Sequence, residues 1–123
     1  MEIKESTPMK SKFPLGTIVM TRGVSQRIKN IKDRLEFSPE SADHLREEYA
    51  NLLVGTWLAR HSKGDWGECC DEDKSVNDEA LKVGNRLMSV YLFPDEPVGA
   101  AGKVWVITEW DRSVTTLLLP EEY

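Results

Sequence analysis

The sequence predicts one α+β domain, in which a four-stranded, mainly antiparallel sheet packs on one long and one or two short helices. Near the C-terminus, two runs rich in Val, Ile, Thr and Trp flank the polar residues 111–113, which is typical of two strands joined by a tight turn. A long apolar pattern at helical spacing precedes them. The length of 123 residues, without an internal repeat, fits one domain over residues 13–123 after a flexible polar tail over residues 1–12.

One strand and one short helix are expected directly after the tail. Gly16 leads into a strand over residues 17–22, which Gly23 ends. A short helix follows, because apolar residues then recur at spacings of three and four: Ile28, Ile31 and Leu35.

The longest helix is predicted from Ser38 to about His61. Ser38 can cap the free amide groups, Pro39 suits the first helical position, and Glu40 complements the positive end of the helix dipole. One apolar stripe is expected to support the sheet: Ala42, Leu45, Tyr49, Leu52, Leu53, Thr56 and Trp57. Gly64 supplies the left-handed residue that ends the helix.

The C-terminal half is expected to hold one more short helix and three strands. Residues 68–73 are mostly acidic and predict a solvated loop, after which Asn77 caps a helix over residues 78–83. The run 87–93 is apolar on both faces, which predicts a strand at the centre of the sheet. The chain closes with the hairpin, so that short connections join the last three strands into a meander.

Composition favours a globular protein of the cytoplasm. No apolar run approaches the ~20 residues that a membrane helix needs, and the N-terminus lacks the apolar core of a secretory signal. Cys69 and Cys70 are adjacent and can bridge to each other only with strain, which fits a reducing compartment. We therefore expect no membrane contact and no disulfide.

Charge is divided unevenly along the chain. Residues 1–34 hold eight basic against three acidic residues, whereas residues 35–123 hold eight against eighteen. The acidic body disfavours general binding to nucleic acid, since phosphate neutralisation supplies most non-specific affinity. A local nucleic-acid contact stays open as an alternative, through a set of basic residues near the N-terminus: Arg22, Arg27, Lys29, Lys32 and Arg34.

The segment from His61 to Gly67 is the leading candidate for a chemical site. Its two glycines allow a sharp backbone path, and Asp65 beside Trp66 can present a carboxylate against an aromatic wall. His61 and Asp65 together suit a small-ligand pocket or general acid–base chemistry. In the alternative, the segment is a helix C-cap in which Asp65 bonds loop amides and Trp66 seals the core.

Metal and thiol chemistry are discounted, and no cofactor is expected. The stretch 71–77 begins like a calcium loop, but Val76 occupies the required glycine position and Lys82 the position of the bidentate glutamate. Cys69 and Cys70 lie among acidic residues, which raise a thiol pKa and oppose a reactive thiolate.

A partner contact is expected at the closing hairpin. Of the four tryptophans, Trp110 lies next to the turn and should be the most exposed, and exposed Trp is enriched at binding hot spots. Asp111 and Arg112 are the charged residues that we expect to accompany it.

Four blocks of sequence carry a family resemblance. The first two are Thr21-Arg22-Gly23-Val24 and His61-x-x-Gly64-Asp65-Trp66-Gly67, and Asp73 and Asn77 also match. The last two are Gly84-x-Arg86-Leu87-x-Ser89-x-Tyr91 and Trp105-x-Ile107-Thr108-Glu109-x-Asp111-Arg112-Ser113-x-Thr115-Thr116-x-Leu118-Leu119-Pro120-Glu121-Glu122-Tyr123. In these blocks the chain resembles small proteins of bacterial plasmids, integrated elements and phages that are labelled "plasmid-related protein". The resemblance implies a mobile-element context and a shared scaffold, with no established activity. Some members carry the label of a methyltransferase subunit, but this chain has no glycine-rich cofactor turn.

Three functions follow as hypotheses. The first is a non-enzymatic accessory protein of a mobile element that binds a protein partner, with action against host defences as one form of it. The second is nucleic-acid binding through the basic N-terminal residues, and the third is a small enzyme that uses His61 and Asp65. A homodimer through an exposed sheet edge also stays open.

Overall fold

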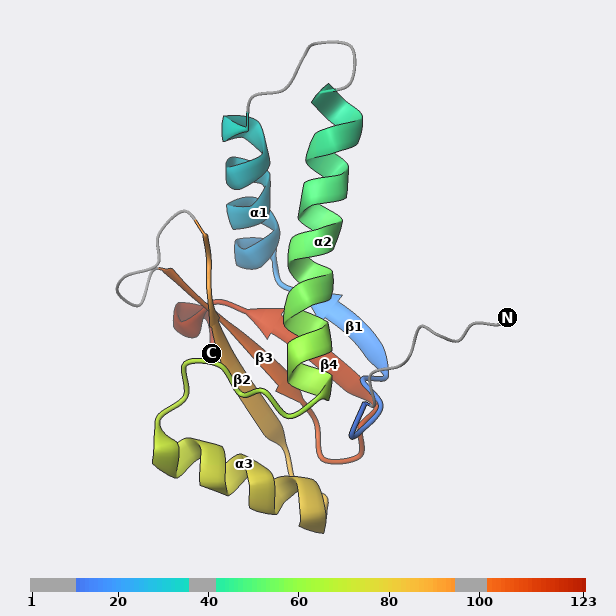
Figure 1. Cartoon of the computed structure of the whole chain (residues 1–123), viewed down its shortest axis with the longest axis vertical. Helices are drawn as coiled ribbons and strands as arrows, with labels where there is room; N and C mark the ends of the chain where they lie inside the picture. The colour runs from blue at the N-terminus through green and yellow to red at the C-terminus, as the bar shows by residue number, and fades with distance from the viewer. Residues whose placement is uncertain (1–10, 36–41, 95–101) are drawn as a thin grey trace, which may run out of the picture.

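The computed structural model describes residues 11–35, 42–94 and 102–123 (Figure 1). In chain order the elements are β1 (Thr17–Met20), α1 (Arg22–Arg34), α2 (Ala42–Ser62), α3 (Asp71–Val83), β2 (Leu87–Leu92), β3 (Lys103–Thr108), β4 (Val114–Leu118) and the 3-10 turn η2 (Pro120–Glu122). The predicted α+β class and single domain are confirmed. Of the predicted tail, residues 1–10 lie outside the described residues, while the Lys12 N–H donates to Ser62 O over 2.7 Å.

The four strands form one sheet in the order β1-β4-β3-β2. The predicted meander is confirmed, because β2, β3 and β4 pair antiparallel with their neighbours in sequence. The expectation of a mainly antiparallel sheet is corrected to a mixed sheet, since β1 pairs parallel to β4. The chain between β1 and β4, which contains the three helices and then β2 and β3, supplies the long crossover that parallel pairing requires, and no local pattern in β1 specifies its direction.

The predicted central position of the 87–93 strand is wrong, because β2 lies at an edge of the sheet. Its apolar side chains pack into two clusters, because Leu87 and Val90 lie with Ala80 of α3 and Tyr91 lies with Trp57 of α2. Side chains and loop backbone also close its outer edge. The Asn77 amide donates to Met88 O over 2.7 Å and accepts from Met88 N over 3.1 Å, and Val90 bonds Trp66 O and Glu68 N.

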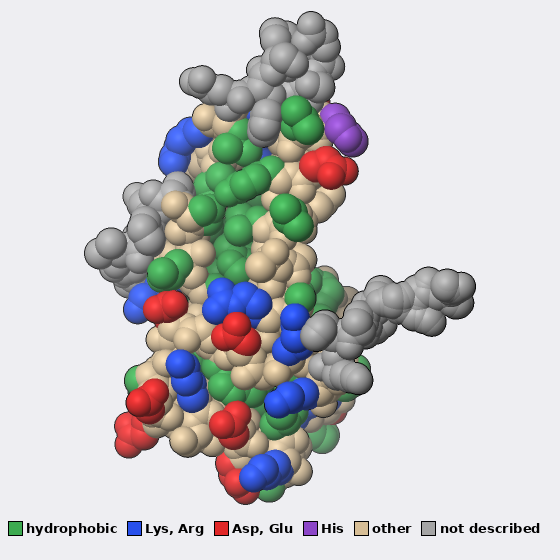
Figure 2. Space-filling view, viewed as in Figure 1, with side chains coloured by type: hydrophobic (Ala, Val, Ile, Leu, Met, Phe, Trp, Pro, Cys, Tyr) green, Lys and Arg blue, Asp and Glu red, His purple; other side chains and the backbone are tan. Residues whose placement is uncertain are grey.

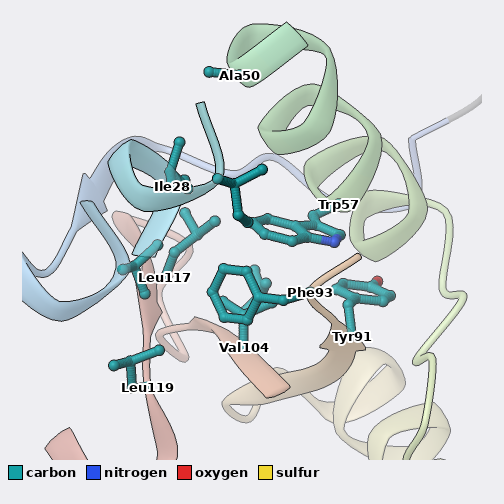
Figure 3. Close-up of a cluster of buried hydrophobic side chains, with 11 residues drawn as sticks. Ile28, Ala50, Trp57, Tyr91, Phe93, Val104, Leu117 and Leu119 are labelled. Atoms are coloured by element: carbon teal, nitrogen blue, oxygen red, sulfur yellow. The ribbon is translucent and has the colours of Figure 1, made fainter. Parts of the chain in front are cut away.

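α1 and α2 lie together on one face of the sheet (Figure 1). They enclose the main core with the inward side chains of the strands, and Trp57 meets Phe93 edge to face at 5.2 Å (Figure 3). The buried members of this core are Val24, Ile28, Ile31, Ala50, Trp57, Tyr91, Phe93, Val104, Val106, Leu117 and Leu119. Figure 2 shows apolar side chains gathered along the seam between the two helices, with charged side chains over the lower half of that view.

α1 begins earlier than predicted. Thr21 is its N-cap, and its hydroxyl accepts a hydrogen bond from the Val24 N–H. Gly23 therefore lies in the first helical turn and does not end a strand, and β1 stops at Met20. The Glu122 carboxylate bonds the Thr21 hydroxyl and the Gly23 N–H, which ties the start of α1 to η2.

α2 matches its predicted end and part of its predicted stripe, of which Tyr49, Leu53 and Trp57 face the core. The expected caps at residues 38–40 lie outside the described residues, while Gly64 is left-handed at φ 84°, as predicted. Leu52 is 69% exposed and Leu45 is also exposed, so neither belongs to the inward face. That face is rotated and is formed by Tyr49, Ala50, Leu53, Val54, Trp57, Leu58 and His61.

The acidic stretch at residues 71–73 is the first turn of α3, so the predicted solvated loop is wrong from Asp71 onward. Carboxylates suit this position because the N-terminus of a helix carries partial positive charge. Asn77 is a buried residue inside α3 and not its cap, since its amide group pairs with Met88. Gly84 ends the helix in the left-handed conformation, as predicted.

Gly67 and Gly84 provide a matched test of the closed β2 edge. Both have positive φ, but a Cβ on Gly67 lies 2.0 Å from Val90 O, whereas a Cβ on Gly84 meets nothing within 4 Å. We expect Gly84→Ala to lower the free energy of unfolding by about 1–2 kcal/mol, and Gly67→Ala by at least about 2 kcal/mol more. Urea denaturation measures both; equal losses would contradict the close approach at Val90.

Candidate functional site

His61, the predicted catalytic candidate, is fully buried on the last turn of α2. Its Nδ1 lies 2.6 Å from Ser89 Oγ on β2, and its Nε2 lies 2.9 Å from Thr108 Oγ1 on β3. Phe13 and Trp66 pack against the ring, with centroids 5.2 and 5.8 Å from it. Four side chains therefore enclose the imidazole: Phe13, Trp66, Ser89 and Thr108.

The hydrogen bonds continue from His61 to the N-terminal segment in one consistent direction. The Thr115 hydroxyl donates to Leu15 O over 2.7 Å, so it accepts from the Thr108 hydroxyl, 2.6 Å away. Thr108 has then used its only proton and must accept from His61 Nε2–H. A neutral imidazole carries one proton, so Nδ1 accepts from Ser89. We call Ser89, His61, Thr108, Thr115 and the Leu15 carbonyl the His61 chain.

The environment of His61 favours the neutral ring. Burial lowers its pKa to about 3, and the positive charge of Arg112 acts in the same direction. Protonation would place a second N–H on Nδ1, where the Ser89 hydroxyl already donates. His61 is thus a structural residue held by its partners, without a free lone pair for general-base chemistry.

Asp65, the second catalytic candidate, belongs to the loop after α2. Its carboxylate accepts from Arg60 Nε over 2.7 Å and from the Gly67 N–H over 3.1 Å. The hydrogen bond from Arg60 is the main cause that holds the pKa of Asp65 below its usual value, with Gly67 contributing in the same direction. No hydrogen bond joins Asp65 to His61 within the described parts of the chain.

Trp66 completes the helix C-cap that the sequence left as the alternative. It is buried, and its Nε1–H donates to Asp78 Oδ1 over 2.9 Å. The Tyr91 hydroxyl donates to the Asp65 carbonyl over 2.6 Å, and the Asp65 N–H donates to Arg60 O over 2.9 Å. Among His61, Asp65 and Trp66, the geometry matches a cap that seals the core rather than a pocket with convergent reactive groups.

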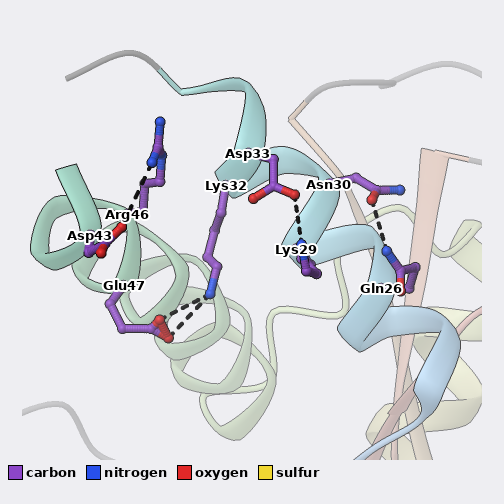
Figure 4. A network of polar contacts seen from close by, with 8 residues as sticks. All are labelled: Gln26, Lys29, Asn30, Lys32, Asp33, Asp43, Arg46 and Glu47. Carbon is purple, nitrogen blue, oxygen red and sulfur yellow. Dashed lines mark hydrogen bonds and ion pairs between the residues drawn. The ribbon is translucent and has the colours of Figure 1, made fainter. Parts of the chain in front are cut away.

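Two of the basic residues of α1, Lys29 and Lys32, form ion pairs within the pair of helices α1 and α2 (Figure 4). Lys29 forms an ion pair with Asp33 at 2.8 Å, and Lys32 pairs with Glu47 of α2 at 3.0 Å. The Arg27 guanidinium lies 4.3 Å from the centre of the Phe93 ring. Arg22 and Arg34 stand at opposite ends of the helix. The five predicted residues are thus spread along the length of α1, and the nucleic-acid contact stays a prediction.

The turn between β3 and β4 presents Trp110, whose side chain is 66% exposed, as predicted. Trp57 and Trp66 are buried and Trp105 is half-buried, so Trp110 is the most exposed of the four. Asp111 accepts from the Ser113 N–H over 3.0 Å and from its hydroxyl over 2.6 Å. These bonds lower the pKa of Asp111, the hydroxyl of Ser113 being the largest cause.

Arg112 fixes this turn to its surroundings. It has a left-handed backbone at φ 61°, and its Nη1 donates to Asn85 O over 2.7 Å and to Glu109 O over 3.1 Å. Its guanidinium lies 5.6 Å from the centre of the Phe13 ring. Arg112 therefore connects the β3–β4 turn, the α3–β2 connection and the N-terminal segment, and Trp110 is displayed on a constrained support.

The two cysteines differ in their surroundings. Cys69 is buried, and burial followed by the charge of Asp73 raises the pKa of its thiol, while Cys70 is exposed at the start of α3. In the described ranges, no three His, Cys, Asp or Glu residues are arranged to hold a metal ion. No helix there has the length and apolar character needed to cross a membrane.

The sequence did not reveal the partners of His61. Ser89 and Thr108 lie on strands 28 and 47 residues further along the chain, and Thr115 joins them only once β3 and β4 pair. A signal was present in the inward positions of these strands, where small hydroxyl residues interrupt large apolar ones.

Comparisons with protein-family models, curated proteins and solved structures gave no match to this chain.

The depressed pKa of His61 predicts a pH-dependent stability. Below about pH 6.5 the unfolded chain binds a proton at this site that the folded chain takes up only near pH 3. The contribution of neutral His61 to the free energy of unfolding is therefore fully present above pH 6.5. This contribution falls by about 1.4 kcal/mol per pH unit as the pH drops toward 3. Urea denaturation of wild type and His61→Gln isolates this slope from that of the carboxylates. Parallel curves for the two proteins would contradict it.

Proposed function

We propose that this chain is a non-enzymatic binding module that contacts a protein partner through the β3–β4 turn, with Trp110 as the anchor. The observation that carries the proposal is a tryptophan exposed on a turn fixed by its own hydrogen bonds. Trp is enriched among residues that dominate binding energy. A support that is already ordered lowers the entropy lost when a partner binds.

The state of the polar side chains supports a binding function over catalysis. His61 is neutral, buried and bonded through both ring nitrogens, while Asp65 is committed to Arg60 and Gly67. A small enzyme would need His61 and Asp65 to face a shared pocket as a reactive pair. Both side chains are instead bonded to residues that hold the fold together.

The chemistry around Trp110 indicates the kind of partner. Glu109 and Asp111 flank it in sequence, and the positive group of Arg112 is directed to backbone carbonyls and Phe13. A complementary surface has an apolar pocket for the indole and basic residues around it. Basic clefts of this kind occur in nucleases, so the proposal includes an acidic accessory protein of a mobile element that acts against a host defence enzyme in the reducing cytoplasm.

Trp110→Ala and Leu52→Ala provide the test. Both remove an exposed apolar side chain, at 66% and 69% exposure, but only Trp110 lies on the proposed contact. Immobilised wild type, with nuclease added, is used to capture proteins from a bacterial host lysate. We expect Trp110→Ala to lower the recovery of a specific protein by about tenfold or more, and Leu52→Ala to leave it unchanged. Equal recovery by all three, at equal thermal stability, would refute the contact.

A further inference from the structure

The two edge strands of the sheet differ in whether their outward backbone groups have hydrogen-bond partners. The outer edge of β2 is closed by Asn77 and by residues 66–68, which take up the backbone groups of Met88 and Val90. β1 occupies the other edge, and its Ile18 and Val19 side chains are 41% and 42% exposed. An open strand edge is a template for the addition of another strand.

The hydrogen bonds to β4 identify which backbone groups of β1 point outward. Thr17 N–H donates to Ser113 O over 2.9 Å, and Thr21 N–H donates to Leu117 O over 3.0 Å. Backbone groups alternate in direction along a strand, so those of Ile18 and Met20 point away from β4. Within the described residues, no hydrogen bond reaches these outward N–H and C=O groups.

We propose that this β1 edge pairs with β1 of a second copy of the chain, antiparallel, about a two-fold axis at Val19. In this register Ile18 lies opposite the partner's Met20, and such a pair exchanges both of its N–H···O bonds. Val19 lies opposite the partner's Val19 at the axis. The same pairs recur on both sides, which is the self-complementarity that a two-fold dimer requires.

Side-chain chemistry and shape support a second copy as the occupant. Residues 17–20 read Thr-Ile-Val-Met, so no like charges face each other across the axis, and β-branched residues pack well as cross-strand pairs. Beside Met20, a hollow of about 270 Å³ opens between α1 and α2, with Ile28, Ala50 and Val54 as the apolar part of a lining that also holds polar and charged side chains. In the proposed register, the partner's Ile18 lies on the same face of the sheet as Met20, next to which this hollow opens.

The first experiment measures molar mass by light scattering across a range of protein concentrations. The molar mass of the wild-type protein is expected to rise from that of a monomer to that of a dimer as the protein concentration increases. Ile18→Pro removes an outward N–H while leaving the bonds to β4 intact, a position at which edge strands tolerate proline. Val19→Lys places two like charges at the axis. Both variants are expected to stay monomeric over the range in which wild type dimerises.

The second experiment tests the register by cross-linking in a Cys70→Ser background, which removes the exposed native thiol. Opposed residues of a non-hydrogen-bonded pair lie about 4.5 Å apart at Cα, within reach of a disulfide. Val19→Cys is therefore expected to form a disulfide dimer about tenfold faster or more than Val76→Cys, an exposed control on α3.

A monomer at every concentration, or equal cross-linking rates for the two cysteine variants, would overturn the dimer. The first of these results would leave the open edge to a strand from a different protein. If Ile18→Pro fails to fold, the Val19→Lys and Val19→Cys variants still decide the matter. Binding through Trp110 is measured separately, so the dimer and the partner contact can fail independently.

Discussion

The His61 chain is the interaction on which the other features of this structure depend. It joins α2 through His61, β2 through Ser89, β3 through Thr108, and β4 through Thr115, and it ends at the Leu15 carbonyl. Every proton in it has one acceptor, so the tautomer and the hydroxyl directions are determined together. Loss of one member leaves a buried polar group without a partner, which costs about 1–3 kcal/mol.

This buried chain also determines what lies outside the core. By holding Leu15, it places the N-terminal segment against the sheet, where Phe13 covers the imidazole and contacts the guanidinium of Arg112. Arg112 in turn holds the turn that presents Trp110. The same residues that make His61 unreactive therefore also support the turn of the proposed binding surface.

Local signals in the sequence predicted local features of the structure. The closing hairpin, the left-handed Gly64 and the exposure of Trp110 each depend on a few neighbouring residues. The parallel pairing of β1, the edge position of β2 and the role of Asn77 depend on contacts between distant segments, so spacing and composition did not reveal them. His61 combined both cases, since its position near the end of a helix was predictable and its hydroxyl partners were not.

Nitrogen-15 NMR of the imidazole rings tests the structural role of His61 most directly. The chain has only one other histidine, His44, which is exposed and gives the reference signal of a ring in contact with solvent. We expect the His61 ring to carry its one proton on Nε2 and to stay neutral from pH 8 down to about pH 4. A proton on Nδ1, or a ring that becomes charged near pH 6.5, would contradict the His61 chain and return His61 to the list of reactive groups.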